Sequence, residues 1–190
     1  MDHKINDLIA KRYSPRAFSE RIVEKEKLDK MFEAARWAPS SFNDQPWSFI
    51  FASKENKKDF YSILDTMVEF NRNWAKTAPM LIAAIARKNF EVTGKKNLHA
   101  WYDVGQSVAM MSLQATEMGL FLHQMAGFSH DKAAQVLEVP DTHQVVTLIA
   151  AGYLGDKDIL PSDIAKNEDK PRVRKKQQDF VFSGKWGRGF

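Results

Sequence analysis

Apolar residues recur at helical spacing in several segments of the chain. The clearest is residues 24–38, where apolar side chains follow the i, i+3, i+4, i+7 pattern of an amphipathic helix, at Leu28, Met31, Phe32 and Ala35. Pro39 is expected to end this helix, because proline has no backbone N–H to donate. The pattern also predicts a short amphipathic helix over residues 5–12 and helices over residues 54–70 and 129–139.

Residues 100–119 form the most apolar of the predicted helices. Small and apolar side chains occupy nearly all of its faces, and few charges interrupt them. Such a helix is typically buried, either in a core or at a subunit interface. Gly119 is expected to cap its C-terminus, since glycine readily adopts the left-handed conformation found there.

Four apolar runs predict the strands of a sheet: residues 47–53, 80–87, 121–128 and 143–155. Residues 156–174 carry no periodic pattern and are predicted to be loop, whereas residues 179–187 are either a terminal strand or an arm. Strands and helices alternate loosely. We therefore predict an α+β fold with a central sheet of about four or five strands covered by helices.

The composition fits one globular domain over residues 1–190, with residues 176–190 as a candidate arm. Hydrophobic residues make up 44% of the chain and charged residues 27%, and no apolar run is long enough to span a membrane. The formal net charge of +4 is mild, so we expect no nucleic-acid partner. The chain has no cysteine, which excludes disulfides and thiolate metal sites and fits a cytoplasmic protein.

No catalytic constellation is evident in the sequence. There is no G-x-S-x-G motif, and the five histidines form no H-x-x-x-H pair, so neither a serine nucleophile nor a metal site is predicted. G-x-G-x-x-G and P-loop motifs are also absent. A nucleotide-like cofactor would therefore need side chains to hold its phosphate.

Basic side chains stand near both ends of the chain. Residues 11–18, here called the basic loop, read K-R-Y-S-P-R-A-F and carry Arg12, Ser14 and Arg16, while Arg172 and Arg174 lie in the later segment R-V-R-K-K. The planar guanidinium group can donate two hydrogen bonds to a phosphate. For each segment taken alone, a solvated surface is the more common interpretation.

A second polar loop joins the helix over residues 24–38 to the first strand. This amide loop, residues 39–46, contains Ser40, Ser41, Asn43 and Gln45. Amide groups donate and accept hydrogen bonds, which suits the edge of a heteroaromatic ring. By composition alone the loop could equally be an ordinary capping turn.

The two loops and the helix between them resemble the N-terminal signature of the FMN-dependent nitroreductase family. The chain reads R-Y-S-P-R-A-F, then E-A-A-R-W-A-P-S, then N-D-Q-P-W-S-F, in the order and spacing of the family. The segments N-R-N-W-A-K-T-A-P, Y-D-V-G-Q-S and V-V-T-L-I-A-A-G-Y-L-G-D resemble its later blocks, and R-V-R-K-K stands where the family has a basic segment. The resemblance covers nearly the whole chain.

The resemblance implies non-covalent FMN at the interface of a homodimer, in a nitroreductase-like fold with a mixed, mainly antiparallel sheet. It implies cofactor contacts from Arg12, Tyr13, Ser14, Arg16, Pro39, Ser40, Ser41, Asn43, Gln45, Asn71, Ala126, Gly127, Arg172 and Arg174. The amide loop is expected to reach the flavin of the partner subunit, and Arg16 is a candidate for the positive charge near its N1–C2 edge. The arm is a candidate to wrap the partner.

The function implied is reduction of nitroaromatics, quinones or similar electron-poor acceptors by NADH or NADPH, with hydride passing through flavin N5 and no catalytic residue required. Many family members have a glutamate where this chain has Ala126, and the chain leaves little room for a substrate lid. Reductive dehalogenation and flavin fragmentation stay open as other chemistries of the fold, although the missing substrate lid counts against them. An anion- or nucleic-acid-binding module built on the two basic segments is the alternative from another class.

Overall fold

A four-stranded antiparallel sheet forms the centre of the fold in the computed structural model, which describes residues 3–189. Its strands are β1 (Trp47–Ser53), β2 (Met80–Arg87), β3 (Leu120–Met125) and β4 (His143–Tyr153). They lie in the order β1-β2-β4-β3, and every neighbouring pair is antiparallel. The predicted α+β class and strand number are confirmed.

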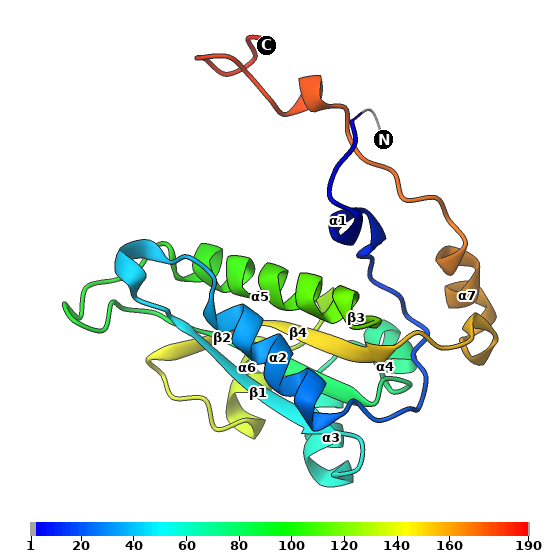
Figure 1. The fold of residues 1–190 in the computed structure, drawn as a ribbon. Coiled ribbons are helices and arrows are strands. Elements are labelled where there is room, and N and C mark those ends of the chain that lie inside the picture. The colour runs from blue at the N-terminus through cyan, green and yellow to red at the C-terminus, as the bar shows by residue number, and fades with distance from the viewer. Residues whose placement is uncertain (1–2, 190) are drawn as a thin grey trace.

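Helices cover both faces of the sheet (Figure 1). Met80, Ile82 and Ala84 of β2 pack in one apolar cluster with residues of α2 (Lys25–Arg36) and α5 (Ala100–Glu117). The alternate residues of β2 pack in a second cluster with α3 (Lys57–Leu64), α4 (Glu69–Ala75) and α6 (His130–Val136). Because β2 is buried on both faces, its sequence is an uninterrupted apolar run.

The remaining helices lie outside these two layers. They are α1 (Asp7–Lys11) and α7 (Ser162–Glu168), with short 3₁₀ turns at η1 (Ser41–Asn43), η2 (Lys157–Ile159) and η3 (Gln177–Asp179). After α7 the chain runs back past α1, and its last part extends away from the sheet (Figure 1). Within residues 3–189, no helix is long and apolar enough to cross a membrane.

The single helix predicted over residues 54–70 is wrong. The structure has two helices there, α3 and α4, because the chain between them pairs with the segment after β3. Met67 forms a β-bridge with Phe128, and the Val68 N–H donates to the Gly127 carbonyl at 3.0 Å. These contacts join segments about sixty residues apart in the chain and leave no local sequence signal.

Two predictions for the C-terminal third also need correction. Residues 156–174, predicted to be loop, contain η2 and α7, and α7 is anchored by the buried Ile164. Residues 179–187 contain no strand; they form turns, and Trp186 is 92% exposed. The terminal-strand alternative is therefore wrong, and the arm remains a prediction.

Candidate functional site

Arginines from the two ends of the chain meet beside α1. Arg172 donates from Nη1 to the Arg12 carbonyl and from Nη2 to the Ala10 carbonyl, both at 2.7 Å, across more than 150 positions of sequence. Arg12 in turn donates to Ser14 Oγ at 3.3 Å. The basic loop and the R-V-R-K-K segment, each ambiguous in sequence, therefore form one cluster of arginines: Arg12, Arg172 and Arg174.

This arginine cluster is electrostatically unsatisfied. Partial burial lowers the pKa of the Arg12 guanidinium, and the positive charges of Arg172 and Arg174 lower it further. Like charges this close repel one another, and an anion bound among them would relieve the repulsion. The donor set fits a phosphate, because guanidinium groups and a serine hydroxyl all donate to its oxygens.

The basic loop is held in place by the sheet. Tyr13 packs edge to face on Phe121 of β3, with ring centroids 4.8 Å apart, so its side chain belongs to the core. Phe18 bridges Leu154 just beyond β4, and the Gly155 N–H donates to the Ala17 carbonyl at 3.0 Å. A Cβ on Gly155 would lie 2.4 Å from the Phe18 backbone, so only glycine permits this approach.

Arg16 points to a different partner from Arg12. Its Nη1 lies 3.1 Å from Glu168 Oε1, and its backbone N–H donates to Glu168 Oε2 at 2.8 Å. Arg16 Nε is buried and has no hydrogen-bond partner among the described residues. The pair fixes α7 against the basic loop. Glu168 was missed in the sequence because it lies in a segment predicted to be loop.

His123 joins the basic loop to the sheet and to α4. Its Nδ1 lies 2.9 Å from the Pro15 carbonyl, and its ring packs against the buried Trp74, with ring centroids 4.4 Å apart and the planes tilted by 38°. A carbonyl only accepts, so Nδ1 carries the proton. Burial lowers the pKa of His123, and this outweighs the hydrogen bond to Pro15, which raises it. No spacing rule in the sequence singles out this histidine.

Asn71 and Gly127 meet at the end of β3. Asn71 Nδ2 donates to the Gly127 carbonyl at 3.1 Å, and a Cβ on Gly127 would lie 2.6 Å from Asn71 Nδ2 and 2.9 Å from Val68. A side chain at position 127 would therefore have to displace the side chains of Asn71 and Val68. Ala126, one residue earlier, is exposed. The structure thus brings together two residues that the sequence linked only through the family resemblance.

The amide loop has an unusual backbone. Phe42, Asn43 and Gln45 have φ of 55°, 54° and 48°, in the left-handed region that side chains disfavour. The Gln45 N–H donates to Ser40 Oγ at 3.0 Å, and the Gln45 amide donates to Asn43 at 3.3 Å. Strain concentrated in this way is typical of functional sites, where surrounding contacts hold it in place.

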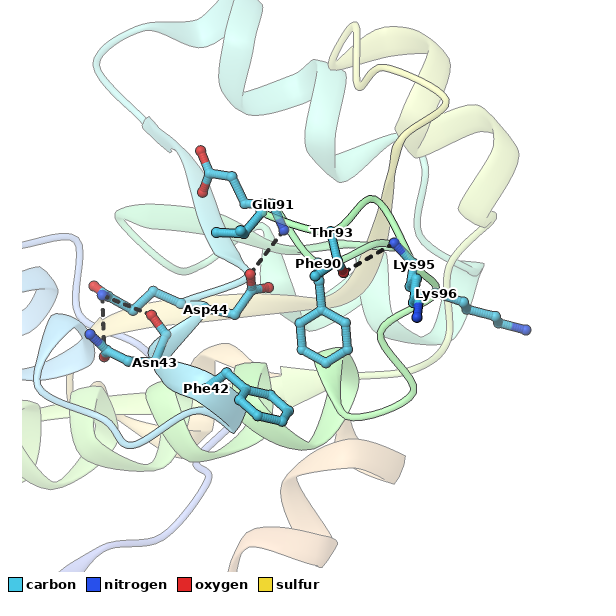
Figure 2. Close-up of a pocket in the computed structure, with 10 residues that line it drawn as sticks. Phe42, Asn43, Asp44, Phe90, Glu91, Thr93, Lys95 and Lys96 are labelled. Carbon is cyan, nitrogen blue, oxygen red and sulfur yellow. Dashed lines mark hydrogen bonds between the residues drawn. The ribbon is translucent and has the colours of Figure 1, made fainter.

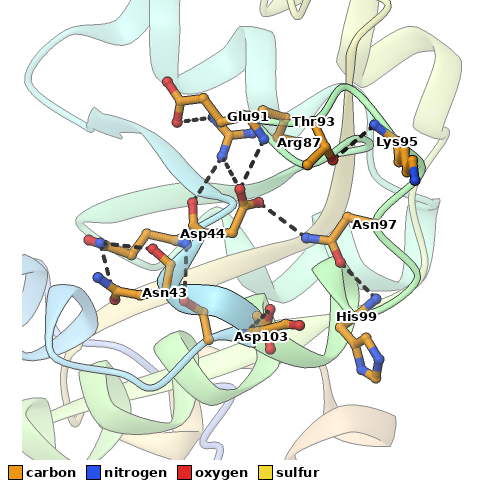
Figure 3. A network of polar contacts seen from close by, with 12 residues as sticks. Asn43, Asp44, Arg87, Glu91, Thr93, Lys95, Asn97, His99 and Asp103 are labelled. Atoms are coloured by element: carbon orange, nitrogen blue, oxygen red, sulfur yellow. Dashed lines mark hydrogen bonds and ion pairs between the residues drawn. The ribbon is translucent and has the colours of Figure 1, made fainter.

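Buried carboxylates supply those surrounding contacts (Figure 3). Asp103, at 2% exposure, accepts from the Ser41 N–H at 3.1 Å, and the nearby Gln106 amide donates to the Pro39 carbonyl at 3.4 Å. Asp44 lies 3.1 Å from Arg87. Burial raises the pKa of Asp44, but the hydrogen bond from the Glu91 N–H and the pair with Arg87 outweigh burial and leave it below its ordinary value.

Two of the predicted segments, the amide loop and the basic loop, lie at opposite ends of α5. The amide loop is bonded to Asp103 in the first turns of this helix, whereas the basic loop packs on β3, which begins just after its last turn. An 18-residue helix is about 27 Å long. One chain therefore does not bring the amide loop to the arginine cluster.

Within residues 3–189, no cluster of three or more histidine, aspartate or glutamate side chains could hold a metal ion. The structure provides the arginine cluster, the turn at Gly127 with Asn71 beside it, and the strained amide loop with its hydrogen-bonding groups. These suit the binding of a phosphorylated ring compound.

Comparisons with known proteins agree with this interpretation. The model of the nitroreductase family matches residues 9–153. A crystal structure described as an oxidoreductase containing FMN is 34% identical, with a TM-score of 0.93, and the match covers 99% of this chain and 96% of that one.

Two curated relatives carry enzyme names. Iodotyrosine deiodinase 1 of Rattus norvegicus is 29% identical over 77% of this chain, and the match covers 61% of the rat protein. The oxygen-insensitive NADPH nitroreductase of Helicobacter acinonychis is 29% identical over 47% of this chain and 41% of its own. Because the family model covers most of the chain and the predicted sheet and helices are present, the protein belongs to the nitroreductase family and has its α+β fold.

Proposed function

We propose that this protein is an FMN-dependent NAD(P)H oxidoreductase that reduces nitroaromatics, quinones or similar electron-poor acceptors. The observation that carries the proposal is the meeting of Arg12, Arg172 and Arg174 with no carboxylate paired to any of them among the described residues. A phosphate completes this cluster. The similarity to an FMN-containing oxidoreductase and to an NADPH nitroreductase supports the cofactor and the electron donor.

The proposed cofactor contacts follow the two groups of residues. The arginine cluster and Ser14 hold the phosphate, with Tyr13 contributing its backbone. Asn71, Ala126 and Gly127 border the ring, and Arg16 stabilises negative charge at the pyrimidine edge. Pro39, Ser40, Ser41, Asn43 and Gln45 contact the ring from a second subunit.

A homodimer follows from the distance between the two groups. Because the amide loop is bonded near the start of α5, a helix about 27 Å long, and the basic loop packs on β3 beyond the other end of that helix, one cofactor meets both only when two copies associate. Exposed apolar side chains at the start and middle of α5 support this assembly: Trp101 at 49%, Tyr102 at 68% and Met110 at 42%. Trp101→Glu is expected to shift the dimer to monomer in analytical ultracentrifugation; an unchanged dimer would place the interface elsewhere.

Bound FMN supplies two-electron transfer between the nicotinamide and the acceptor. For a nitro compound, NAD(P)H provides a hydride and solvent provides one further proton; one N–O bond breaks, and a nitroso compound and water leave. The protons come from solvent and donor. This agrees with a site in which the sequence predicted no catalytic acid or base.

Purification tests the proposal directly. We expect a yellow protein whose flavin absorbance bleaches on anaerobic addition of NADH or NADPH and returns when a nitroaromatic is added. A colourless protein that cannot be reconstituted with FMN would refute it. A flavoprotein that neither nicotinamide reduces would refute only the electron donor.

Arg174 offers a sharp test of the phosphate role. Among residues 3–189, its side chain donates only to the Val173 carbonyl, so removing it disturbs little else. Arg174→Ala is expected to weaken FMN binding by about 1.5–3 kcal/mol, the worth of a charge-assisted hydrogen bond. Arg188→Ala removes the same charge from the same terminal segment and is the matched control. Equal affinities of the two variants would contradict the assignment.

The similarity to an iodotyrosine deiodinase favours reductive dehalogenation as a second candidate function. In that reaction the donor supplies two electrons, the carbon–iodine bond breaks and iodide leaves. A proton takes the place of the iodine on the ring. Anaerobic incubation with NADPH and 3-iodotyrosine tests it. Iodide release faster than nitro reduction would make dehalogenation the main activity, and its absence would leave the first proposal alone.

A further inference from the structure

A cavity of about 760 Å³ lies between the amide loop and the loop that follows β2 (Figure 2). This volume is within the range of about 300–1,000 Å³ that is usual for small-molecule sites. Its walls include two phenylalanines and two lysines: Phe42, Phe90, Lys95 and Lys96. We call it the aromatic pocket. None of these four residues was singled out in the sequence.

The apolar side of the pocket is aromatic. The Phe42 and Phe90 rings meet edge to face with centroids 5.7 Å apart, and Phe42 is 92% exposed. Phe42 also has φ of 55°, so the loop holds a bulky residue in a disfavoured conformation with its ring turned outward. An exposed ring face of this kind binds another planar ring by offset stacking.

The charges that the pocket leaves available to a ligand are positive. The two acids in its wall, Asp44 and Glu91, are both engaged by Arg87, at 3.1 and 2.6 Å. Within the described residues, neither Lys95 nor Lys96 forms an ion pair. A pocket lined by two lysines and two aromatic rings matches a planar ring that carries an anionic group.

The pocket is pre-formed, because one residue ties its walls together (Figure 3). Asp44 of the amide loop accepts from the Glu91 N–H at 2.9 Å and from Asn97 Nδ2 at 3.2 Å, both on the facing loop. Arg87 Nη2 donates to the Asp44 carbonyl at 2.9 Å. Ligand binding therefore does not have to order the two loops, which favours affinity.

From these observations we propose that the aromatic pocket binds the electron acceptor, and that this acceptor is an aromatic carboxylate. The ring stacks on Phe42 and Phe90, and the carboxylate contacts Lys95 and Lys96. Phe42 belongs to the same strained loop that is proposed to contact the flavin, so a ring held there lies beside the cofactor. This inference rests on the proposed function for its redox part, but the binding part can be measured without any reductant.

The test compares 4-nitrobenzoate with its neutral analogue 4-nitrobenzamide. Calorimetric titration of the oxidised holoprotein is expected to show 4-nitrobenzoate binding that Lys95→Gln/Lys96→Gln weakens about three- to tenfold. Lys57→Gln/Lys58→Gln removes the same two charges from α3, distant from the pocket, and is the matched control. Phe90→Leu is expected to weaken both compounds alike.

Steady-state reduction of the same pair separates the two proposals. The ratio of kcat/KM for the carboxylate over the amide should fall by a similar factor in Lys95→Gln/Lys96→Gln, through KM. Because each variant is tested with both compounds, their intrinsic reactivities cancel. Reduction of both compounds with an unaltered ratio, or no binding of 4-nitrobenzoate, would overturn the pocket assignment. Binding without any reduction would overturn the proposed function alone.

Discussion

Single residues hold the strained parts of this molecule in place, and Asp44 is the main example. Its carboxylate contacts a backbone N–H, an amide and a guanidinium group on one facing segment. Its side chain is only 5% exposed. A buried carboxylate with three partners is costly to remove, because each partner loses its acceptor.

Asp44→Ala is therefore expected to lower the free energy of unfolding by about 2–4 kcal/mol, measured by urea denaturation. Asp29→Ala removes an aspartate whose pair with Lys25 is exposed at both ends, and should change it by at most about 0.5 kcal/mol. Similar losses in the two variants would mean that the Asp44 network does not hold the walls of the pocket.

His123 gives the protein a dependence on pH. Burial lowers its folded pKa below the ordinary 6.5, so the unfolded chain takes up a proton first as the pH falls. The stability that neutral His123 contributes is present above pH 6.5 and is lost as the pH falls from there through the folded pKa. Arg16 lies close by and disfavours the protonated ring further.

His123→Asn keeps a donor near the Nδ1 position and removes the titration. Urea unfolding at pH 7.5 and 5.5 should show a smaller loss of stability in His123→Asn than in the unaltered protein. The affinity for FMN should also fall less between pH 7.5 and pH 5.5 in the variant, because His123 holds the basic loop through Pro15. If the free energy of unfolding fell equally with pH in both proteins, His123 would not be the group responsible.

Among the elements, the amide loop between α2 and β1 adopts a backbone conformation that lowers stability. Three side-chain-bearing residues in the left-handed region are unfavourable for a loop this short. Glycine adopts this region without strain. Because the loop has no glycine at these three positions, we infer that their side chains contribute to function. Stability and function should therefore separate on substitution.

Gln45→Gly is expected to raise the free energy of unfolding by about 0.5–1 kcal/mol and yet weaken FMN binding. Glu138→Gly relieves the same kind of strain, at φ of 51°, in the exposed turn after α6. It should stabilise similarly and leave FMN affinity unchanged. If Gln45→Gly bound FMN as well as Glu138→Gly, Gln45 would have no role in the site.

At the scale of the whole molecule, α1 and the segment after α7 lie on the same side of the sheet (Figure 1), and the arginine cluster joins them. Beyond this cluster, residues 176–189 contribute no buried side chain. A tail that carries Phe180 at 59% and Trp186 at 92% exposure gains stability only by packing on another surface. The partner subunit is the surface that we propose for it.

A variant ending at Lys175 is therefore expected to keep its fold and lose dimer stability. Analytical ultracentrifugation should show a dissociation constant at least tenfold higher, about 1.4 kcal/mol. Circular dichroism should be nearly unchanged, because no strand or long helix is removed. A truncated protein that dimerises as tightly as the full chain would show that the arm is dispensable.

Local sequence determined much of this architecture. The apolar run of β2, the i, i+3, i+4, i+7 spacing of α2 and the small residues of α5 were sufficient, because period and turn chemistry act over a few neighbouring residues. The basic and amide loops were also recognisable in sequence, since their residue types and their spacing carry the family resemblance.

Tertiary structure alone decided the rest. The break between α3 and α4, the pair of Arg16 with Glu168, the contact of His123 with Pro15 and the walls of the aromatic pocket all join residues that are distant in sequence. Such contacts depend on how the sheet and helices pack, and no local pattern in the sequence predicts them. The sequence by itself thus specified the elements and the chemistry of the two loops; packing decided which residues meet, and it placed the two loops at opposite ends of α5.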